Sequence, residues 1–366
     1  MRVMRVSRFL WALFICLALT LGMSLIKAES SEPLASDVTP PADSKKDMVV
    51  PTGEGTGSVT ERPVIGATQP PSPFSWKVTA GPLVLHREKN DKVTLFTDST
   101  GAELLNARDL NLGFGCGLDS SLGVKVRTLG TAFGAEVRYF GIYDWSQSDS
   151  TLSTTAVLNR NGTTISYFGT PATPVYITGK YESGLQNVEG NLSWYPIERI
   201  RTFIGVRYIH IDEELKDESV FTSGFAPLAE NITATNNLLG GQLGVEGVFL
   251  GKTDDGFSID GWAKVGYFDN DISTKARLGV NVLSVASRST SSEDKGTLGT
   301  EFGIGVKYAF TRNIAISARY QLLWLDKVAF APQQVPVVNY SPGGRFNAAT
   351  DSVLYQGGWI GLILSF

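Results

Sequence analysis

The chain has 366 residues, which is enough for one large domain or two small ones. Its formal net charge is −4 and charged residues make up 19% of it, so it carries no basic footprint for a nucleic-acid partner. Residues 9–26 are the one segment that approaches the roughly 20 apolar residues of a membrane-spanning helix. These features exclude a multi-pass helical membrane protein, and the 39 glycines favour turns and β-structure over long helices.

Residues 1–28 have the pattern of a secretory signal peptide. Arg2, Arg5 and Arg8 give a positive start, an apolar run follows, and Ala28 offers a small residue for cleavage. Cleavage there removes four basic residues and no acidic one, which moves the formal charge from −4 to −8. An uncleaved helical anchor is the alternative interpretation.

Residues 29–73 differ in composition from everything that follows them. They are rich in Pro, Ser, Thr and Gly and contain few large apolar side chains. Such a segment cannot bury enough apolar surface to offset the entropy of ordering itself. We therefore expect a disordered periplasmic tail, with binding to peptidoglycan or to a partner as the alternative.

From residue 74 to residue 366 the pattern is that of β-structure. Apolar and polar residues alternate in ten segments, and from the second segment onward short turns alternate with long polar loops. The predicted strands span residues 76–87, 118–129, 133–145, 176–194, 200–212, 236–249, 257–269, 297–310, 314–325 and 353–366. The predicted fold class is all-β: a transmembrane antiparallel up-and-down β-barrel of about ten strands, with short periplasmic turns and long extracellular loops. Residues 93–96 and 110–116 could add a hairpin, so we expect between about eight and twelve strands.

The last predicted strand carries a signal of its own. Ile360, Leu362, Leu364 and Phe366 share one face, and the sequence stops on the aromatic residue. An edge this apolar would aggregate in water, so it needs both barrel closure and lipid outside. The pattern resembles the carboxy-terminal assembly signal of bacterial outer-membrane barrels. It predicts the bacterial outer membrane as the location, with outer-membrane lipids, lipopolysaccharide and the barrel-assembly machinery as partners.

Strand parity separates a lipid face from a lumen face. Phe133 and Tyr143, like Phe257 and Tyr267, are spaced ten residues apart on the apolar face. At ~3.3 Å per residue and a tilt of ~40°, ten residues climb about 25 Å, the height of an outer-membrane apolar band. The predicted lumen-lining residues on the opposite face are Lys125, Arg127, Glu136, Arg138, Glu189, Arg207, Glu246, Asp260, Lys264, Glu301, Lys307 and Arg319.

This lumen face permits two interpretations. Its charges have both signs in similar number, and charges in a narrow barrel need partners or water. Several inward positions are glycines, among them Gly244 and Gly303, which we expect to leave room inside. The alternatives are a narrow water-filled pore and a lumen filled by a lattice of ion pairs.

Three short Gly-rich stretches resemble a known family. They are EGN at 189–191 with GVRYI at 205–209 and EEL at 213–215, NNLLGGQLG at 236–244, and DGWAKVG at 260–266. Together they are similar to the bacterial outer-membrane β-barrel porin family numbered seven. The resemblance covers residues 74–366 and implies an outer-membrane barrel with a pore. It supplies no catalytic or binding residues.

Little in the sequence suggests catalysis or metal binding. His86 and His210 are the two histidines, and Asp212 lies close enough to His210 in sequence to form an acid–base pair. His210, however, shares parity with outward-facing residues, so we predict no enzyme activity, no catalytic, cofactor-binding or metal-binding residues, and no cofactor. The acidic residues within 212–218 form either a solvated rim or a site for a divalent cation shared with lipopolysaccharide.

The functional expectation is a narrow, porin-like passive channel for ions or small solutes in the outer membrane. The alternative is a structural or surface-interaction barrel whose lumen is filled by side chains and whose extracellular loops carry the function.

Overall fold

A computed structural model describes residues 74–88, 92–128, 131–161, 163–221, 227–251, 256–280, 285–341 and 344–366. These residues belong to one compact unit, Gln69–Phe366. The predicted signal peptide, 1–28, and the predicted tail, 29–73, lie outside the described residues.

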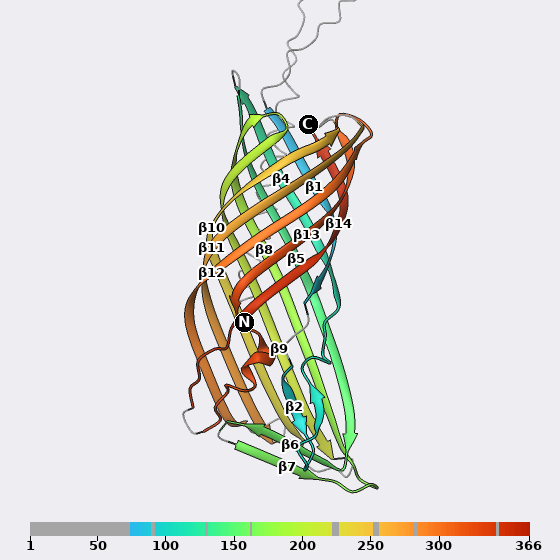
Figure 1. The fold of residues 1–366 in the computed structure, drawn as a ribbon, viewed down its shortest axis with the longest axis vertical. Coiled ribbons are helices and arrows are strands. Elements are labelled where there is room, and N and C mark those ends of the chain that lie inside the picture. The colour runs from blue at the N-terminus through green and yellow to red at the C-terminus, as the bar shows by residue number, and fades with distance from the viewer. Residues whose placement is uncertain are drawn as a thin grey trace, which may run out of the picture. The chain divides into compact units, whose positions relative to one another are not determined.

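The described chain forms a closed antiparallel barrel (Figure 1). Around the ring the order is β1, β14, β13, β12, β11, β10, β9, β8, β5, β4, and β4 pairs with β1 to close it. The strands are β1 (Phe74–Arg87), β4 (Phe114–Thr128), β5 (Thr131–Ser153), β8 (Val175–Ile197), β9 (Ile200–Phe221), β10 (Leu228–Gly251), β11 (Gly256–Val280), β12 (Val285–Ala309), β13 (Ile314–Val328) and β14 (Asp351–Ser365). The prediction of an up-and-down barrel of about ten strands is confirmed.

A second, four-stranded sheet lies at the end of the barrel away from the C terminus (Figure 1). Its order is β3 (Glu103–Asn106), β2 (Thr94–Thr97), β6 (Thr155–Arg160) and β7 (Thr163–Phe168). The first long loop does contain a hairpin, β2 and β3, but its second strand is Glu103–Asn106 and not the predicted 110–116, and the hairpin joins this sheet and not the ring. The end with the short connections and the C terminus is the periplasmic end in barrels of this class.

The connection between β13 and β14 contains α2 (Ala331–Gln334), a single helical turn. Among the described residues, no helix is long and apolar enough to cross a membrane.

An apolar band surrounds the periplasmic half of the barrel. Ile204, Val206, Leu243 and Ile304 are each more than half exposed on its outer face. Exposed aromatic side chains mark the periplasmic edge of the band, at Trp194, Phe249, Phe257, Tyr308 and Phe310, and the outer edge, at Tyr143, Tyr267 and Tyr320. Apolar side chains this exposed on a closed barrel need hydrocarbon around them. The described chain is therefore an outer-membrane β-barrel.

Beyond this band the strands continue where the sequence predicted loops. Residues 146–153, 213–221 and 270–280 are strand, as are 228–235 and 285–296 on the returning side. The prediction of long irregular loops at these places is wrong. Their backbones are paired, and apolar side chains inside the extracellular half of the barrel stabilise them.

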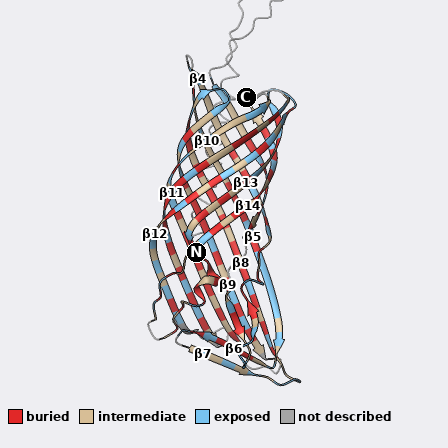
Figure 2. Ribbon diagram, in the orientation of Figure 1, coloured by how far each residue is buried: buried red, intermediate tan, exposed pale blue. Residues whose placement is uncertain are grey.

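The apolar face changes sides along a single strand. On β9, Ile204 and Val206 face outward at 65% and 66% exposure, whereas Ile209 and Ile211 are fully buried inside. Residue-by-residue pairing with β10 continues across this change, and buried and exposed residues alternate along most of the strand (Figure 2). The periplasmic half is thus apolar outside, and the extracellular half is apolar inside.

Trp145 is two residues after the outward-facing Tyr143, so parity would place it outside, but it points into the barrel. Trp145 is 3% exposed, and its Nε1 donates to the Leu112 carbonyl at 2.8 Å. The pairing of β5 with β8 shifts register between Ile142 and Trp145, which marks a β-bulge or irregularity. A bulge inserts one residue and reverses parity after it, so Trp145 turns into the barrel.

The apolar band generates a first prediction. Ile304→Arg places a charge near the middle of the lipid-facing surface and should lower the free energy of unfolding by about 2–4 kcal/mol. Ser292→Arg, on the outer face of the same strand β12 but beyond the band, should lower it far less. Reversible urea unfolding in lipid vesicles measures both. Equal losses in the two variants would contradict the assignment of the band.

Candidate functional site in the barrel lumen

The structure places all twelve predicted lumen-lining residues on the inside of the barrel. Seven of them line a cavity at the periplasmic mouth: Lys125, Arg127, Glu136, Glu246, Asp260, Lys307 and Arg319. The other five form a connected network farther in: Arg138, Glu189, Arg207, Lys264 and Glu301. The two groups have different chemistry.

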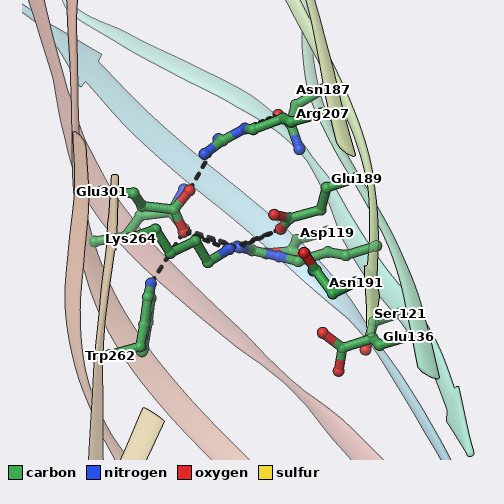
Figure 3. Close-up of polar contacts among 12 residues, drawn as sticks. Asp119, Ser121, Glu136, Asn187, Glu189, Asn191, Arg207, Trp262, Lys264 and Glu301 are labelled. Atoms are coloured by element: carbon green, nitrogen blue, oxygen red, sulfur yellow. Dashed lines mark hydrogen bonds and ion pairs between the residues drawn. The ribbon is translucent and has the colours of Figure 1, made fainter. Parts of the chain in front are cut away.

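Glu301 on β12 is the centre of this inner network (Figure 3). Its side chain is fully buried and pairs with three cations. Arg138 Nη1 lies 2.9 Å and Lys264 Nζ 3.2 Å from Oε1, and Arg207 Nη2 lies 2.9 Å from Oε2. Trp262 Nε1 donates to Oε1 at 3.0 Å. A buried carboxylate needs this many partners to offset its loss of hydration.

The rest of the network crosses the lumen. Glu189 accepts from Lys264 Nζ at 2.7 Å and lies 3.2 Å from Arg138 Nη1. Arg138 also binds Asp119 at 2.6 Å and the Gln321 side-chain oxygen at 2.9 Å. With Gln242, which donates to Glu189, the connected side chains come from eight of the ten barrel strands: β4, β5, β8, β9, β10, β11, β12 and β13.

The network is balanced in charge and leaves little space. Its three cations face three anions, namely Asp119, Glu189 and Glu301. The gap between it and the periplasmic mouth, lined by Thr79, Arg138 and Lys264 among others, has a volume of about 40 Å³. A single water takes up roughly 30 Å³ in the liquid. The network side chains are almost fully buried, so they leave no wide passage at this level.

Glycines do not leave the room that the sequence suggested. A Cβ added to Gly303 would lie 2.1 Å from Trp262 Cζ2, and one added to Gly244 would lie 2.4 Å from Phe203 Cζ. Aromatic rings from neighbouring strands lie across these glycines. The expectation of free space was wrong because small residues in a close-packed interior are matched by large ones opposite.

A second barrier lies on the extracellular side of the network. Phe140, Tyr181, Phe268 and Tyr355 are at most 1% exposed and belong to one apolar core inside the barrel. This barrier consists mainly of apolar side chains in contact, and the Tyr181 hydroxyl within it accepts a hydrogen bond from Arg87 at 2.6 Å.

The segment around α2 covers this core. Buried Glu213 binds Arg87, and its Oε2 accepts from the backbone N–H of Ala331 at 3.0 Å. The Arg87 guanidinium lies 4.9 Å from the ring centroid of Phe330. Asn236 bonds both backbone groups of Ala329, at 2.8 Å each. The connection from β13 to β14 is therefore fixed inside the extracellular half.

The small sheet is attached by a buried ionic cluster that the sequence did not suggest. Arg160 on β6 binds Glu230 on β10 through Nη2 at 2.6 Å, and Tyr340 donates to Glu230 at 2.7 Å. Asp217 Oδ2 lies 3.7 Å from Arg160 Nη2, and within the described residues neither Asp217 oxygen accepts a hydrogen bond. Arg160 and Tyr340 lie 70 and 110 residues from Glu230 in the sequence, so no local sequence pattern could have predicted their contact.

The expected acidic rim does not assemble. Asp212, Glu214 and Glu218 are on the outer side of β9, whereas Glu213 and Asp217 are buried inside. In the described part of the chain, no three His, Cys, Asp or Glu residues are grouped so that they could hold a metal ion. Successive residues of a strand face opposite sides, so carboxylates that are neighbours in the sequence do not form one site here.

His210 and Asp212 have separate partners. His210 Nδ1 lies 2.9 Å from Asn237 Oδ1, and its ring stacks on Tyr208 with centroids 6.4 Å apart. Asp212 accepts from the Thr235 hydroxyl at 2.7 Å. The contact with Asn237 and the stacking on Tyr208 hold the His210 imidazole on the outer side of the barrel, away from the lumen.

Ile360, Leu362 and Leu364 lie on β14, between β1 and β13, and Phe366 directly follows its last residue. Ile360, Leu362 and Phe366 are 58%, 54% and 64% exposed, and Leu364 is partly exposed. Their outward position is compatible with a lipid contact. Recognition by the assembly machinery stays a prediction.

Comparisons with known proteins find only distant likenesses. No protein-family model matches the chain, and no curated protein sequence matches it. Similar solved structures include the outer membrane protease OmpT from Escherichia coli, at 10% identity over 81% of this chain and 98% of that chain, with a TM-score of 0.42. Neisserial surface protein A (12%; 81% and 98%; TM-score 0.25) and the Pseudomonas putida toluene transporter TodX (8%; 81% and 89%; TM-score 0.29) are further examples. Likenesses this distant carry no argument about activity.

The inner network generates a second prediction. Glu301→Gln keeps the shape of the side chain but leaves three cations without their shared anion, so it should lower the free energy of unfolding by about 3–5 kcal/mol. Glu198→Gln is the matched control, because Glu198 is 81% exposed and lies 3.8 Å from Arg127. Urea unfolding of both variants should show almost no loss for the control. A small loss for Glu301→Gln would mean that the network adds little to stability.

A third prediction concerns pH. Burial, and secondarily the neighbouring Glu230, raises the pKa of Asp217 to about 8, and Arg160 opposes this only in part. The folded chain therefore retains this proton when the unfolded chain has lost it, so the stabilising contribution declines as pH rises from about 4 to about 8. Asp217→Asn should thus be at least about 1 kcal/mol more stable than the parent at pH 8, with little difference at pH 4. Unfolding midpoints at the two pH values measure this. A variant that is less stable at pH 8 would show that ionised Asp217 is well paired.

Proposed function

We propose that this protein is an outer-membrane barrel with a closed lumen that acts at the cell surface, as a structural or interaction protein. The observation that carries the proposal is the double barrier in the lumen. A charge-balanced network with Glu301 at its centre crosses the barrel, and an apolar core with Tyr181 and Tyr355 follows it. A solute would have to break ion pairs and then cross packed hydrocarbon.

The extracellular half supports a role outside the cell. Its strands extend well past the apolar band, and the Arg160–Glu230 pair holds the small sheet on them. A chain that only had to span the membrane would not require this ordered extension. The outward residues there are mostly Ser, Thr, Asn and charged side chains, which suit contact with water, saccharide or protein.

A narrow passive channel is the second candidate. A cavity of about 670 Å³ at the periplasmic mouth favours it, because this cavity already provides a polar path from the periplasm into the barrel. Conduction would require the network and the core to separate. The resemblance to the porin family numbered seven belongs with this candidate, and so do small solutes as partners.

Further partners follow from the location. We propose that outer-membrane lipids and lipopolysaccharide contact the exposed apolar band and its aromatic edges. We also propose that the barrel-assembly machinery captures β14 by strand addition, with Ile360, Leu362, Leu364 and Phe366 as the recognised face.

The fourth prediction separates the two candidate functions. Purified, folded protein in planar bilayers should give no discrete conductance steps, because both barriers block the path. Glu301→Ala should also remain silent, since the apolar core still closes the barrel. Folding of each sample is checked by heat-modifiable electrophoretic mobility. Reproducible unitary steps from the parent protein would favour the channel.

A deletion tests the surface role. The backbone N–H of Gly169 donates to the Thr154 carbonyl at 2.7 Å, so the β6–β7 hairpin can be removed by joining these two residues. Glu230→Gln in the same variant avoids leaving a buried carboxylate without Arg160. The matched control is the full-length chain with Glu230→Gln alone. The deletion should reduce surface binding or envelope integrity in cells, and unchanged phenotypes would refute the role of this hairpin.

A further inference from the structure

The extracellular end of the β11–β12 hairpin carries basic residues and no acidic ones. Residues 272–292 contain Lys275, Arg277 and Arg288 and no Asp or Glu. Residues 339–350, in the β13–β14 connection, have Arg345 as their one charged residue. Both statements come from the full sequence, so they include residues 281–284 and 342–343, which lie outside the described ranges. The positive charge of each segment is therefore not offset within it.

The structure brings these four cations together on the outer surface of the barrel. In the pairing of β11 with β12, Arg277 lies directly opposite Arg288, and Lys275 lies opposite Thr290. Arg345 forms a parallel bridge with Thr290, on the other side of β12. All four cations are exposed. We call Lys275, Arg277, Arg288 and Arg345 the basic tip.

The basic tip lacks the carboxylate partners that other cations on this surface have. On β9, Lys216 Nζ lies 3.0 Å from Glu182 and 2.8 Å from Glu214. In the part of the chain that the structure describes, no side chain of the basic tip forms an ion pair. Like charges directly opposite each other in a sheet destabilise it, so the facing of Arg277 and Arg288 does not serve the fold.

The basic tip lies well beyond the membrane. Tyr267 marks the outer edge of the apolar band on β11, and Lys275 and Arg277 lie eight and ten residues farther along this strand. At ~3.3 Å per residue and a tilt of ~40°, they are about 20–25 Å beyond the band. Lipid headgroups lie at the level of the aromatic edges. A partner of the basic tip therefore has its charges above the headgroups.

The surroundings of the basic tip carry hydroxyl groups. Outward positions beside the cations are occupied by Thr233, Ser273, Thr290 and Ser292. Among the described residues of β11 and β12, no large apolar side chain between Tyr267 and Leu298 is exposed. Protein interfaces take most of their affinity from aromatic and other buried anchors, which this surface does not offer.

A saccharide chain with acidic groups fits this surface better. Guanidinium groups bind carboxylate or sulfate oxygens, and the hydroxyls of Ser and Thr can exchange hydrogen bonds with those of a sugar. We infer that the basic tip binds an acidic polysaccharide outside the cell, one whose chain carries carboxylate or sulfate groups.

The inference rests on the proposed surface role and names a partner for it. Bilayer conductance tests the closed lumen, the hairpin deletion tests the small sheet, and equilibrium binding tests the basic tip. These measurements can fail separately. Absence of binding would overturn the basic tip as a site and would leave the closed lumen unaffected.

The experiment is calorimetric titration of the full mature chain in an uncharged detergent, with oligogalacturonate and, separately, with a sulfated dextran oligosaccharide. At least one of these probes should bind saturably, and neutral dextran should not bind. Arg277→Gln/Arg288→Gln should weaken binding about tenfold, since two exposed ionic contacts are lost. Lys275→Gln is an independent variant that should also weaken it. Added salt should weaken binding to the parent protein, because exposed charges are screened.

The matched control removes two exposed cations from the periplasmic end, as Arg127→Gln/Arg312→Gln. It changes the net charge equally and should leave the dissociation constant unchanged. Urea unfolding should show no loss of stability for Arg277→Gln/Arg288→Gln, because the substitutions remove a repulsion. Weaker binding without loss of stability would support a site and exclude misfolding.

Three results would overturn the inference. The first is no saturable binding of either acidic probe to the folded parent protein. The second is equal weakening in the control and in Arg277→Gln/Arg288→Gln. The third is displacement of the bound probe by a water-soluble, short-chain phosphatidylglycerol, which would identify a lipid headgroup as the partner.

Discussion

The strict two-residue alternation of a β-strand is the constraint on which the rest of this structure depends. Each barrel strand has two faces, and the surroundings decide which of them is apolar. Val206 faces hydrocarbon and Ile209 faces the interior, three residues later on the same strand. The pairing of β9 with β10 continues across this change of faces, so the closed barrel satisfies the backbone hydrogen bonds in both halves. One continuous barrel is thus a membrane protein in its periplasmic half and resembles a water-soluble barrel in its extracellular half.

The closed lumen is a consequence of this arrangement. Where the apolar face of the strands contacts lipid, the inward face is polar. Charged side chains inside a narrow barrel must then form pairs. Arg138 reaches across from β5 to Glu301 on β12, and Trp262 lies across Gly303. Where the apolar face turns inward, residues such as Phe268 fill the same space with hydrocarbon. The barrel is therefore blocked for two different physical reasons at two successive levels.

Much of the membrane-spanning part could be predicted from the sequence, because parity alone assigns residues such as Lys264 and Glu301 to the lumen. The extracellular half could not. In segments such as 213–221, Leu and buried acidic residues alternate with exposed charged residues. This pattern resembles a polar loop if apolar residues are expected on the outer face. Parity with Tyr143 would place Trp145 outside, because a bulge leaves no mark in the alternation. The Arg160–Glu230 pair joins residues that only the folded chain brings together.

The two ends of the lumen differ in a way that bears on function. At the extracellular end, two buried ion pairs join Glu213 to Arg87 and Glu230 to Arg160, while buried Asp217 lies 3.7 Å from Arg160. These contacts fix the last connection and the small sheet in place, as expected of a surface that must present one shape. At the periplasmic end, charged side chains from several strands line an open cavity of about 670 Å³ instead of filling it. The lumen is therefore packed at its extracellular end and hollow at its periplasmic end.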